Sequence, residues 1–222
     1  MDWTPFWLSL QLAGLTTLCL LPLSLWLAKW LHFYRGRWQP ILQALVSLPL
    51  VLPPTVLGYY LLLAFQPDSW LGKLTETFLG IQLVFSFPGL VIGSMIFSFP
   101  FMMNPLLSGL AALPKVYEEV AATLGKSSRT LYWRVLLPNI KASIIVGAIM
   151  TFAHTIGEFG VILMIGGNIP GETRVASLAI YQEVEAMNYA TADLYAGILL
   201  GFSLLVLLVV YGFQRKSQQQ QA

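Results

Sequence analysis

Charged side chains are scarce in this sequence, and that scarcity excludes most classes of soluble protein. Only 10% of its 222 residues are Asp, Glu, Lys or Arg, whereas 57% are hydrophobic. Soluble domains carry roughly a quarter charged residues. The formal net charge of +2 is also too small to indicate nucleic-acid binding. We therefore expect an integral membrane protein whose surface contacts lipid and no nucleic acid.

Motifs and residue types that would indicate chemistry are also missing. Cys19 is the single cysteine, so no disulfide can form within the chain. The sequence has no Gly-x-x-x-x-Gly-Lys-[Ser/Thr] loop, which predicts that any ATP hydrolysis takes place in a separate subunit. The two histidines, His32 and His154, are far apart and form no nucleophile or metal-ligand cluster. We expect no enzyme activity, no cofactor and no metal site.

Long apolar runs are what the sequence has in place of charge. A hydrocarbon core of about 30 Å needs about 20 helical residues, and five runs are long enough: residues 6–31, 41–65, 81–110, 140–165 and 194–213. Backbone groups in lipid must be hydrogen-bonded internally, and the alternating pattern of barrel strands is absent. We therefore predict an all-α integral membrane protein with five transmembrane helices. Prolines in the second and third runs predict that these two helices are kinked or interrupted. These prolines are Pro49, Pro53, Pro54, Pro88, Pro100 and Pro105.

The basic residues indicate how the chain crosses the membrane. If the five spans alternate in direction, all but two of the twelve Lys and Arg residues fall on one side, and the exceptions are Lys73 and Arg174. The positive side of a membrane protein is normally cytoplasmic. We expect the N-terminus outside, an outer loop at residues 166–193 and a polar cytoplasmic tail at residues 214–222. Residues 218–221 of that tail are expected to be disordered.

The segment at residues 114–138 is a polar, helix-forming stretch between two apolar runs on the basic side. Glu118 and Glu119 suit the early turns of a helix, where the helix dipole favours negative charge. Gly125 suits a helix C-cap, and Ser127 or Ser128 can cap a second short helix. With Pro114 at the first helical position, the pattern predicts a helix, a glycine turn and a second helix across the cytoplasmic face.

The spacing in this segment resembles the "EAA" loop of type I ABC importer permeases, with a glutamate six residues before a glycine and a proline thirteen after it. The residues that match the motif or flank it are Glu118, Glu119, Ala121, Ala122, Gly125, Leu137 and Pro138. Residues 48–54 also resemble the second core helix of the oxyanion-importing branch, so the resemblance covers nearly the whole chain. It implies one transmembrane domain of the MetI-like permease fold over residues 6–213. It also implies that the loop docks in a groove of a cytoplasmic ATPase subunit.

Two polar residues near the outer end of the fourth run are candidates for the translocation pathway or outer gate. His154 and Glu158 are four residues apart, so one helix face would hold both and allow them to pair. Two ligands do not close a metal site. The plainest interpretation is a structural hydrogen bond or an interhelical pair, and the alternative is a role in gating or in contacting a delivery protein.

Residues 157–160 and 168–174 together resemble the signature of molybdate permeases. Sulfate permeases share the first element but typically carry a basic residue in place of Glu172. Many relatives have Arg where this chain has His154, a departure that leaves a pH-sensitive charge in place of a fixed one. The outer-loop candidates are Asn168, Thr173 and Arg174. Arg174 could meet an oxyanion or an acidic patch on a delivery protein, and the alternative is a solvated loop charge.

Taken together, the resemblance implies the membrane subunit of an ATP-driven molybdate or tungstate importer. Its implied partners are a second copy of the chain, two ATP-binding subunits and an extracytoplasmic molybdate-binding protein. A sulfate or thiosulfate importer permease is the main alternative. A secondary anion transporter would need ion-coupling carboxylates near the midplane and usually an internal repeat, neither of which is evident. The amphipathic stretch from Val175 to Tyr189 is expected to form a short helix in the outer half of the bundle, not a sixth span.

Overall fold

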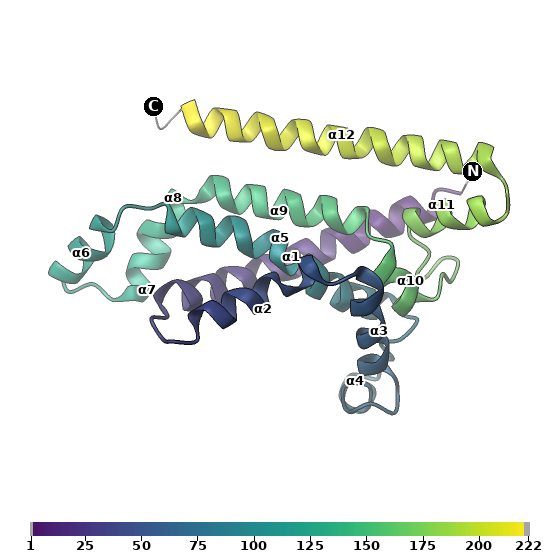
Figure 1. The fold of residues 1–222 in the computed structure, drawn as a ribbon, viewed down its shortest axis with the longest axis horizontal. Coiled ribbons are helices and arrows are strands. Elements are labelled where there is room, and N and C mark those ends of the chain that lie inside the picture. The colour runs from purple at the N-terminus through teal and green to yellow at the C-terminus, as the bar shows by residue number, and fades with distance from the viewer. Residues whose placement is uncertain (1, 220–222) are drawn as a thin grey trace.

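The computed structural model describes residues 2–219, and these residues form helices and loops without a β-strand (Figure 1). The elements are α1 (Thr4–Phe33), α2 (Gln39–Val51), α3 (Pro54–Phe65), α4 (Trp70–Leu79), α5 (Phe87–Ala111), α6 (Val116–Thr123), α7 (Ser128–Leu131), the π-helix η1 (Tyr132–Leu136), α8 (Leu137–Asn139), α9 (Lys141–Ile156), α10 (Gly160–Gly166), α11 (Ala176–Glu185) and α12 (Tyr189–Gln219). The centre of the bundle is made by α1, α5 and α9, which pack on one another more extensively than any other set. The N-terminus and the C-terminus lie at opposite ends of the bundle (Figure 1).

The predicted all-α membrane fold is confirmed. The helix lengths, however, do not by themselves give the five spans that the sequence predicts. Three helices among the described residues are long and apolar enough to cross a bilayer alone: α1, α5 and residues Tyr189–Gly212 of α12. Two further spans exist only if each of two bent helix pairs counts as one. Residues Gln39–Val51 and Pro54–Phe65 meet at 106°, and residues Ser128–Asn139 and Lys141–Ile156 meet at 74°. A count of five therefore stays a prediction.

The prolines act differently in the two runs that contain them. In the second run the helix stops before Pro53, and Pro54 begins α3, as the predicted interruption requires. In the third run, by contrast, α5 continues through Pro100 and Pro105, so these two prolines do not interrupt the helix and a kink there stays a prediction. Close packing of α5 between α1 and α9 holds its backbone in helical form despite the missing donors.

The start of α5 also differs from the predicted span, which begins at residue 81. The helix begins at Phe87, and the Ser86 side chain accepts a hydrogen bond from the backbone N–H of Gly89 at 3.3 Å. A serine N-cap followed by Pro88 in the first turn is a strong start signal. The apolar character of residues 81–86 concealed that signal. At the other end of the chain, α12 continues to Gln219, and the rest of the predicted disordered tail lies outside the described residues.

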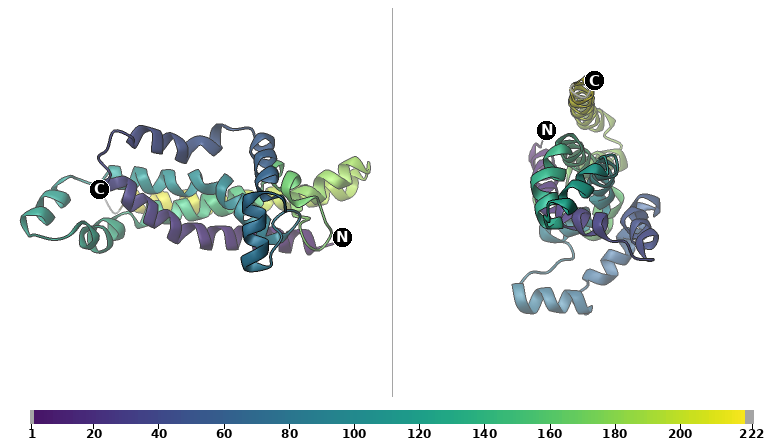
Figure 2. Two further views of the ribbon diagram at one scale, coloured as in Figure 1. Left: turned by 90° about the horizontal axis from the view of Figure 1, so that it is seen from below. Right: turned by 90° about the vertical axis from the view of Figure 1, so that its left-hand side faces the viewer.

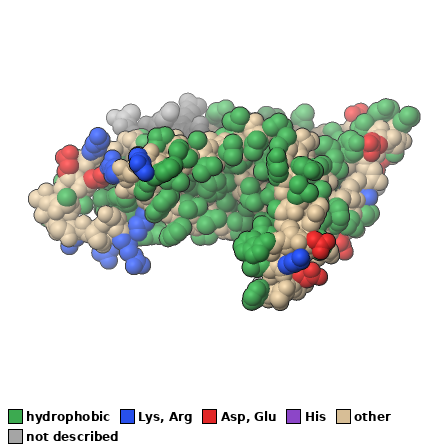
Figure 3. Space-filling model, turned by 60° about the horizontal axis from the view of Figure 1, so that its bottom comes forward, with side chains coloured by type: hydrophobic (Ala, Val, Ile, Leu, Met, Phe, Trp, Pro, Cys, Tyr) green, Lys and Arg blue, Asp and Glu red, His purple; other side chains and the backbone are tan. Residues whose placement is uncertain are grey.

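Two apolar cores stabilise the bundle, one near each end. The core near the N-terminus joins α1, α3, α5, α10 and α11 through buried residues such as Leu12, Leu90 and Ile162. The other core joins α1 and α5 to the η1 segment through residues such as Leu106 and Tyr132. Figure 3 shows Lys and Arg side chains gathered at the end that holds α6, and most Asp and Glu side chains near α4 and α11.

Candidate functional site

The loop between α5 and α9 forms the helix, glycine turn and second helix that the sequence predicts. The first helix, α6, ends before Gly125, whose φ of +63° lies in the left-handed region. The Ser127 hydroxyl then caps α7 by accepting a hydrogen bond from the Thr130 N–H at 3.3 Å. One detail differs: α6 begins at Val116, so Pro114 precedes the helix and does not occupy its first turn.

The α6 helix stands clear of the bundle, at the far end in Figure 1. No residue of α6 is fully buried, and Val120 and Leu124 are 51% and 64% exposed. An apolar cavity of about 330 Å³ lies between α6 and the start of the α7–η1 arm. Helices of eight residues are marginal on their own, and an exposed apolar patch of this kind is typical of a protein-interaction surface. Glu119 and Ala122 are exposed on this helix, and Ala121 is half-buried.

One residue of the predicted coupling set, Glu118, does more than favour the helix dipole. Its Oε2 accepts a hydrogen bond from Arg35 Nη2 at 3.1 Å, and its Oε1 lies 3.2 Å from His32 Nε2. These contacts connect α6 to the last turn of α1 and the residues after it. A cavity of about 220 Å³ with a mixed polar and apolar lining, which includes Lys115 and Gln39, lies beside them. The sequence pattern did not identify His32 or Arg35, because nothing local relates positions so far apart.

The second half of the loop is anchored, unlike α6. Tyr132 is fully buried, and its hydroxyl donates a hydrogen bond to the Leu25 carbonyl at 2.7 Å. Leu136 is also buried, whereas Leu137 is half-buried and Pro138 is exposed. From Ser128 to Asn139 the backbone is continuously helical and then bends into α9. The loop therefore consists of an exposed helix on a firmly anchored helical arm.

The α1–α6 ion pair supplies a first testable prediction. Arg35→Glu should weaken the attachment of α6, because two carboxylates would then face each other. The Arg35 side chain is 71% exposed, so the pair contributes only about 0.2–1 kcal/mol. We expect up to a fivefold loss of amide hydrogen-exchange protection in α6 and none in α9. The exchange Arg35→Glu with Glu118→Arg should recover part of it; no recovery would mean that the two side chains do not interact.

The second candidate region lies where α9 ends. The helix stops at Ile156, and residues 157–159 lead into α10. The predicted pairing of His154 with Glu158 is wrong, because the break removes Glu158 from the helix face that carries His154. Instead, His154 Nδ1 lies 2.9 Å from the Ser98 hydroxyl of α5, and its ring stacks on Phe101 at a centroid distance of 3.9 Å.

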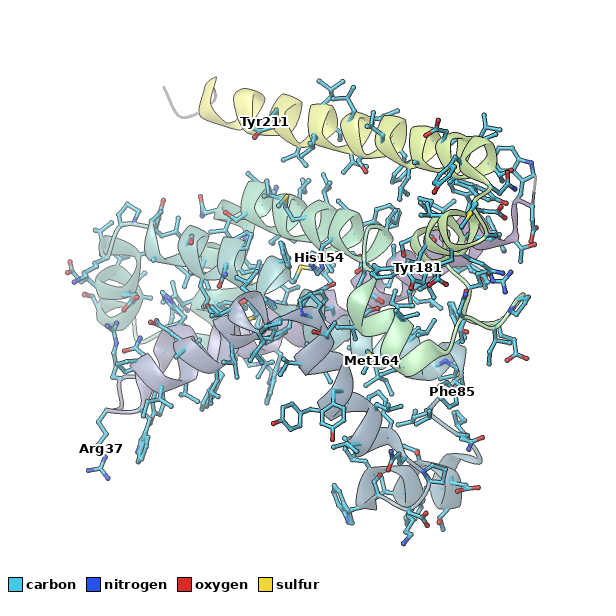
Figure 4. All side chains as sticks on the ribbon, turned by 45° about the vertical axis from the view of Figure 1, so that its right-hand side comes forward. Arg37, Phe85, His154, Met164, Tyr181 and Tyr211 are labelled. Carbon is cyan, nitrogen blue, oxygen red and sulfur yellow. The ribbon has the colours of Figure 1, made fainter. Side chains whose placement is uncertain are left out.

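His154 and Glu158 nevertheless border the same cavity. This cavity has a volume of about 600 Å³. Its walls come from the start of α3, the middle of α5, the end of α9 and the first turns of α10. They include Pro54, Thr55, Phe97, His154, Glu158 and Met164. Figure 4 shows His154 on α9 and Met164 on α10. The break between α2 and α3 and the break between α9 and α10 therefore meet at one hollow.

Glu158 is a buried residue whose backbone carbonyl is hydrogen-bonded and whose carboxylate has no hydrogen-bond partner among the described residues. The residue is 3% exposed, and both carboxylate oxygens lack a hydrogen-bond partner within residues 2–219. Its carbonyl oxygen accepts a hydrogen bond from the Ser177 hydroxyl at 2.6 Å, which ties the break to α11. A buried carboxylate without a partner is costly.

The outer-loop candidates contact one another and do not reach the cavity. Thr173 is fully buried, with its hydroxyl donating to the Gly166 carbonyl at 2.6 Å and accepting from the Ile169 N–H at 2.9 Å. Arg174 Nε donates to Asn168 Oδ1 at 3.0 Å. Asn168 itself has a φ of +57°. Thr173 thus stabilises the turn, and Arg174 is a half-buried, held side chain and not a freely solvated charge.

The next segment forms α11, the short helix expected after the outer loop. It starts at Ala176, whose N–H donates to the Ser9 hydroxyl of α1 at 2.8 Å. Its buried face consists of Ala176, Leu178 and Ala179. With Ser177 bonded to the break at Glu158, α11 links α1 to the wall of the cavity. This link was not visible in the sequence, because serines at such positions are common in any loop.

The structure as a whole is that of a multi-pass membrane protein with an exposed helical loop at one end and a helix-break cavity in its interior. The chain belongs to the family of binding-protein-dependent transport system inner membrane components, whose sequence profile matches residues 21–220. The chain is therefore a membrane component of an ABC-type importer, as the resemblance implied.

Individual relatives are consistent with that family. The chain is 46% identical to the molybdenum transport system permease protein ModB of Azotobacter vinelandii over 209 residues, which cover 94% of this chain and 92% of the relative. It is 35% identical to a probable sulfate transport system permease protein cysT of Chlorella vulgaris, over 82% of this chain and 68% of that one. Among solved structures, a bacterial alginate ABC transporter in complex with its periplasmic protein matches 96% of this chain and 78% of its own, with a TM-score of 0.75 at 18% identity.

Proposed function

We propose that this chain is the membrane permease subunit of an ATP-driven importer of molybdate, working as a pair of copies with two ATP-binding subunits and an extracytoplasmic molybdate-binding protein. The choice of molybdate as the substrate is supported by the 46% identity to a molybdenum permease across 94% of the chain, against 35% identity to the sulfate relative. Tungstate has the same tetrahedral dianionic form and belongs to the same substrate class.

The proposed orientation places α6 in the cytoplasm and the N-terminus outside. It is supported by the segregation of charge, since basic side chains gather around the α6 end of the bundle (Figure 3). In this orientation the exposed face of α6, with Glu119 and Ala122, is the surface offered to the ATP-binding subunit. Gly125 lets the chain turn back directly behind that surface.

Coupling between that surface and the cavity would pass through α9. The anchored arm of residues 128–139 joins α6 to α9, and the sixteen residues of α9 span about 24 Å. At its far end α9 carries His154 and leads into the break at Glu158, both on the cavity wall. Force applied at the loop would therefore tilt a rigid helix against α5 and reshape the cavity. Docking of a binding protein and binding of ATP should then be thermodynamically coupled.

The cavity suits passage of an anion more than its tight binding. Its lining is mostly apolar, and His154 is its only basic side chain. A path for a dianion must hold its solute weakly enough to release it. The open side of the cavity is where a second copy would complete the path. We infer that the binding protein supplies most of the selectivity.

Transport assays can test the substrate directly. The chain, expressed with its partner subunits in cells without a molybdate importer, should restore uptake of radiolabelled molybdate. Excess unlabelled tungstate should compete strongly and excess sulfate weakly. If the complex takes up radiolabelled sulfate and unlabelled molybdate does not inhibit that uptake, the sulfate permease alternative is supported. Uptake that persists without the ATP-binding subunit would instead indicate a secondary transporter.

The outer turn supplies a second prediction. Exchanging residues 168–174 for the corresponding turn of a sulfate permease should change which binding protein stimulates ATP hydrolysis by the complex. The exchange must retain Thr173, because its two hydrogen bonds hold the turn. We expect several-fold weaker stimulation by the molybdate-binding protein and unchanged hydrolysis without it. Equal stimulation in both complexes would make the turn purely structural.

A further inference from the structure

The segment between the second and third predicted spans contains an amphipathic helix, α4 (Trp70–Leu79), that the membrane topology does not explain. The helix is closed at both ends: Ser69 Oγ accepts a hydrogen bond from the Gly72 N–H at 2.9 Å, and Gly80 ends it with a φ of +64°. The Ser69 hydroxyl also donates to the Ala64 carbonyl at 2.5 Å, which joins α4 to the end of α3. The segment is thus a defined helix and not merely a connection.

The two faces of α4 differ sharply. At about 100° per residue, Trp70, Leu71, Leu74 and Phe78 fall within an arc of about 100°. All four are exposed, and Trp70 and Phe78 are 76% and 79% exposed. Lys73 and Glu76 lie on the opposite side of the same helical projection and are also exposed. Two aromatic rings left almost uncovered on one stripe indicate a surface that something else covers.

The direction of α4 identifies what can cover that stripe. In the view down the long axis of the bundle, α4 appears at its full length, so it runs across the long helices (Figure 2). In Figure 3 hydrophobic side chains cover the side of the projecting α3–α4 limb that is turned towards the α6 end of the molecule, and charged side chains lie on the other side. The limb that carries the exposed apolar stripe of α4 therefore has a hydrophobic side of its own, and it lies to one side of the hydrophobic surface of the long helices (Figure 3).

We propose that α4 binds the surface of the phospholipid bilayer, lying in the membrane plane with Trp70 and Phe78 inserted at the boundary between headgroups and acyl chains. Amphipathic helices with Trp and Phe on the apolar side occupy this depth. Lys73 and Glu76 cancel in charge, so binding rests on apolar burial and not on anionic lipid. The proposal depends on membrane embedding, which the family establishes, and not on the transported anion.

Bilayer attachment of α4 would also matter for the cavity. The helix is joined to α3, and the first residues of α3, Pro54 and Thr55, form part of the cavity wall. The 106° bend between α2 and α3 carries the α3–α4 limb away from the bundle. With α4 held at the membrane surface, that limb has a fixed outer end, so α9 and α10 move against a stationary wall.

Site-specific fluorescence can test this proposal on the full transporter in phosphatidylcholine vesicles. In a Cys19→Ser background, Phe78→Cys and the matched polar-face variant Glu76→Cys are each labelled with an environment-sensitive fluorophore. We expect lipids with a quencher high on the acyl chain to quench the Phe78→Cys label several-fold more than the Glu76→Cys label. Iodide in the aqueous phase should show the reverse order. Both positions are exposed, so the substitutions leave the core unchanged.

Two results would overturn the proposal. If iodide quenches both labels equally, α4 stands in water. If the Phe78→Cys label is shielded from iodide and from quencher lipids, and the unlabelled variant forms a disulfide between two copies, the stripe is a dimer contact. Trp70→Cys repeats the measurement at the other exposed ring. Molybdate uptake by the labelled complexes is a separate readout, so loss of the lipid result leaves the proposed transport function untouched.

Discussion

Gly125→Val is expected to abolish transport while the subunit remains folded in the membrane. Gly125 holds a φ of +63° with no atom near the position of an added Cβ, so the barrier to substitution is backbone conformation and not space. A β-branched residue in the left-handed region costs roughly 1–2 kcal/mol or more. The chain can relieve that cost by changing the turn, because α6 is exposed and has no buried residue to hold it.

The consequence of a changed turn is a displaced docking surface. We expect molybdate uptake to fall at least about tenfold, which is about 1.4 kcal/mol of lost coupling. Basal ATP hydrolysis should lose its response to the binding protein. Gly125→Asn is the matched control, since asparagine tolerates the left-handed region, and it should retain most of the uptake. Wild-type uptake by the valine variant would mean that the turn does not position α6 for a partner.

Gly160→Val is expected to be the most damaging substitution at the cavity. A Cβ added to Gly160 would lie 2.7 Å from Pro54 Cβ, a separation that packed side chains do not tolerate. The proline ring cannot rotate away, so α10 must move away from α3 at the point where the two helices form the cavity wall. Overpacking of this kind typically costs 1–3 kcal/mol. We expect loss of uptake together with a lower unfolding temperature of the purified complex.

The same four-residue motif contains a matched control. Gly157 is exposed, and a Cβ added there would meet its nearest atoms at 3.8 and 3.9 Å, which is ordinary contact. Gly157→Val should therefore leave the unfolding temperature unchanged. If the two variants have the same unfolding temperature, the contact between α10 and α3 does not restrict residue 160 to glycine. If Gly157→Val is stable but inactive, the exposed side of the motif faces the partner copy or the solute.

Local sequence patterns were sufficient to predict the helix, glycine turn and second helix of the loop between α5 and α9. The glycine, the serine cap and the alanine-rich first helix each act on their immediate neighbours, and the structure places them as the pattern indicates. The same local reasoning was wrong for His154 and Glu158. A spacing of four residues brings side chains together only while the helix continues, and α9 ends between them.

Contacts between distant residues could not be inferred from a single sequence. Glu118 meets Arg35 across 83 positions of the chain, and Ser177 meets the break at Glu158 from a different helix. Likewise, Pro100 and Pro105 are ordinary helix breakers by sequence, and packing against α1 and α9 overrides them. In each case the free energy comes from a neighbour that the local sequence does not contain.

The sequence by itself determined that the chain is a helical membrane protein and that one end carries an exposed, glycine-turned helical loop. Hydrophobic length and helix capping decide those features, and both are properties of consecutive residues. Only the tertiary structure decided that the breaks at Pro53 and Gly157 meet at one cavity, and that α4 lies across the long helices on a limb with one hydrophobic side. Those features depend on how helices pack, because a break or an amphipathic face acquires a partner only in three dimensions.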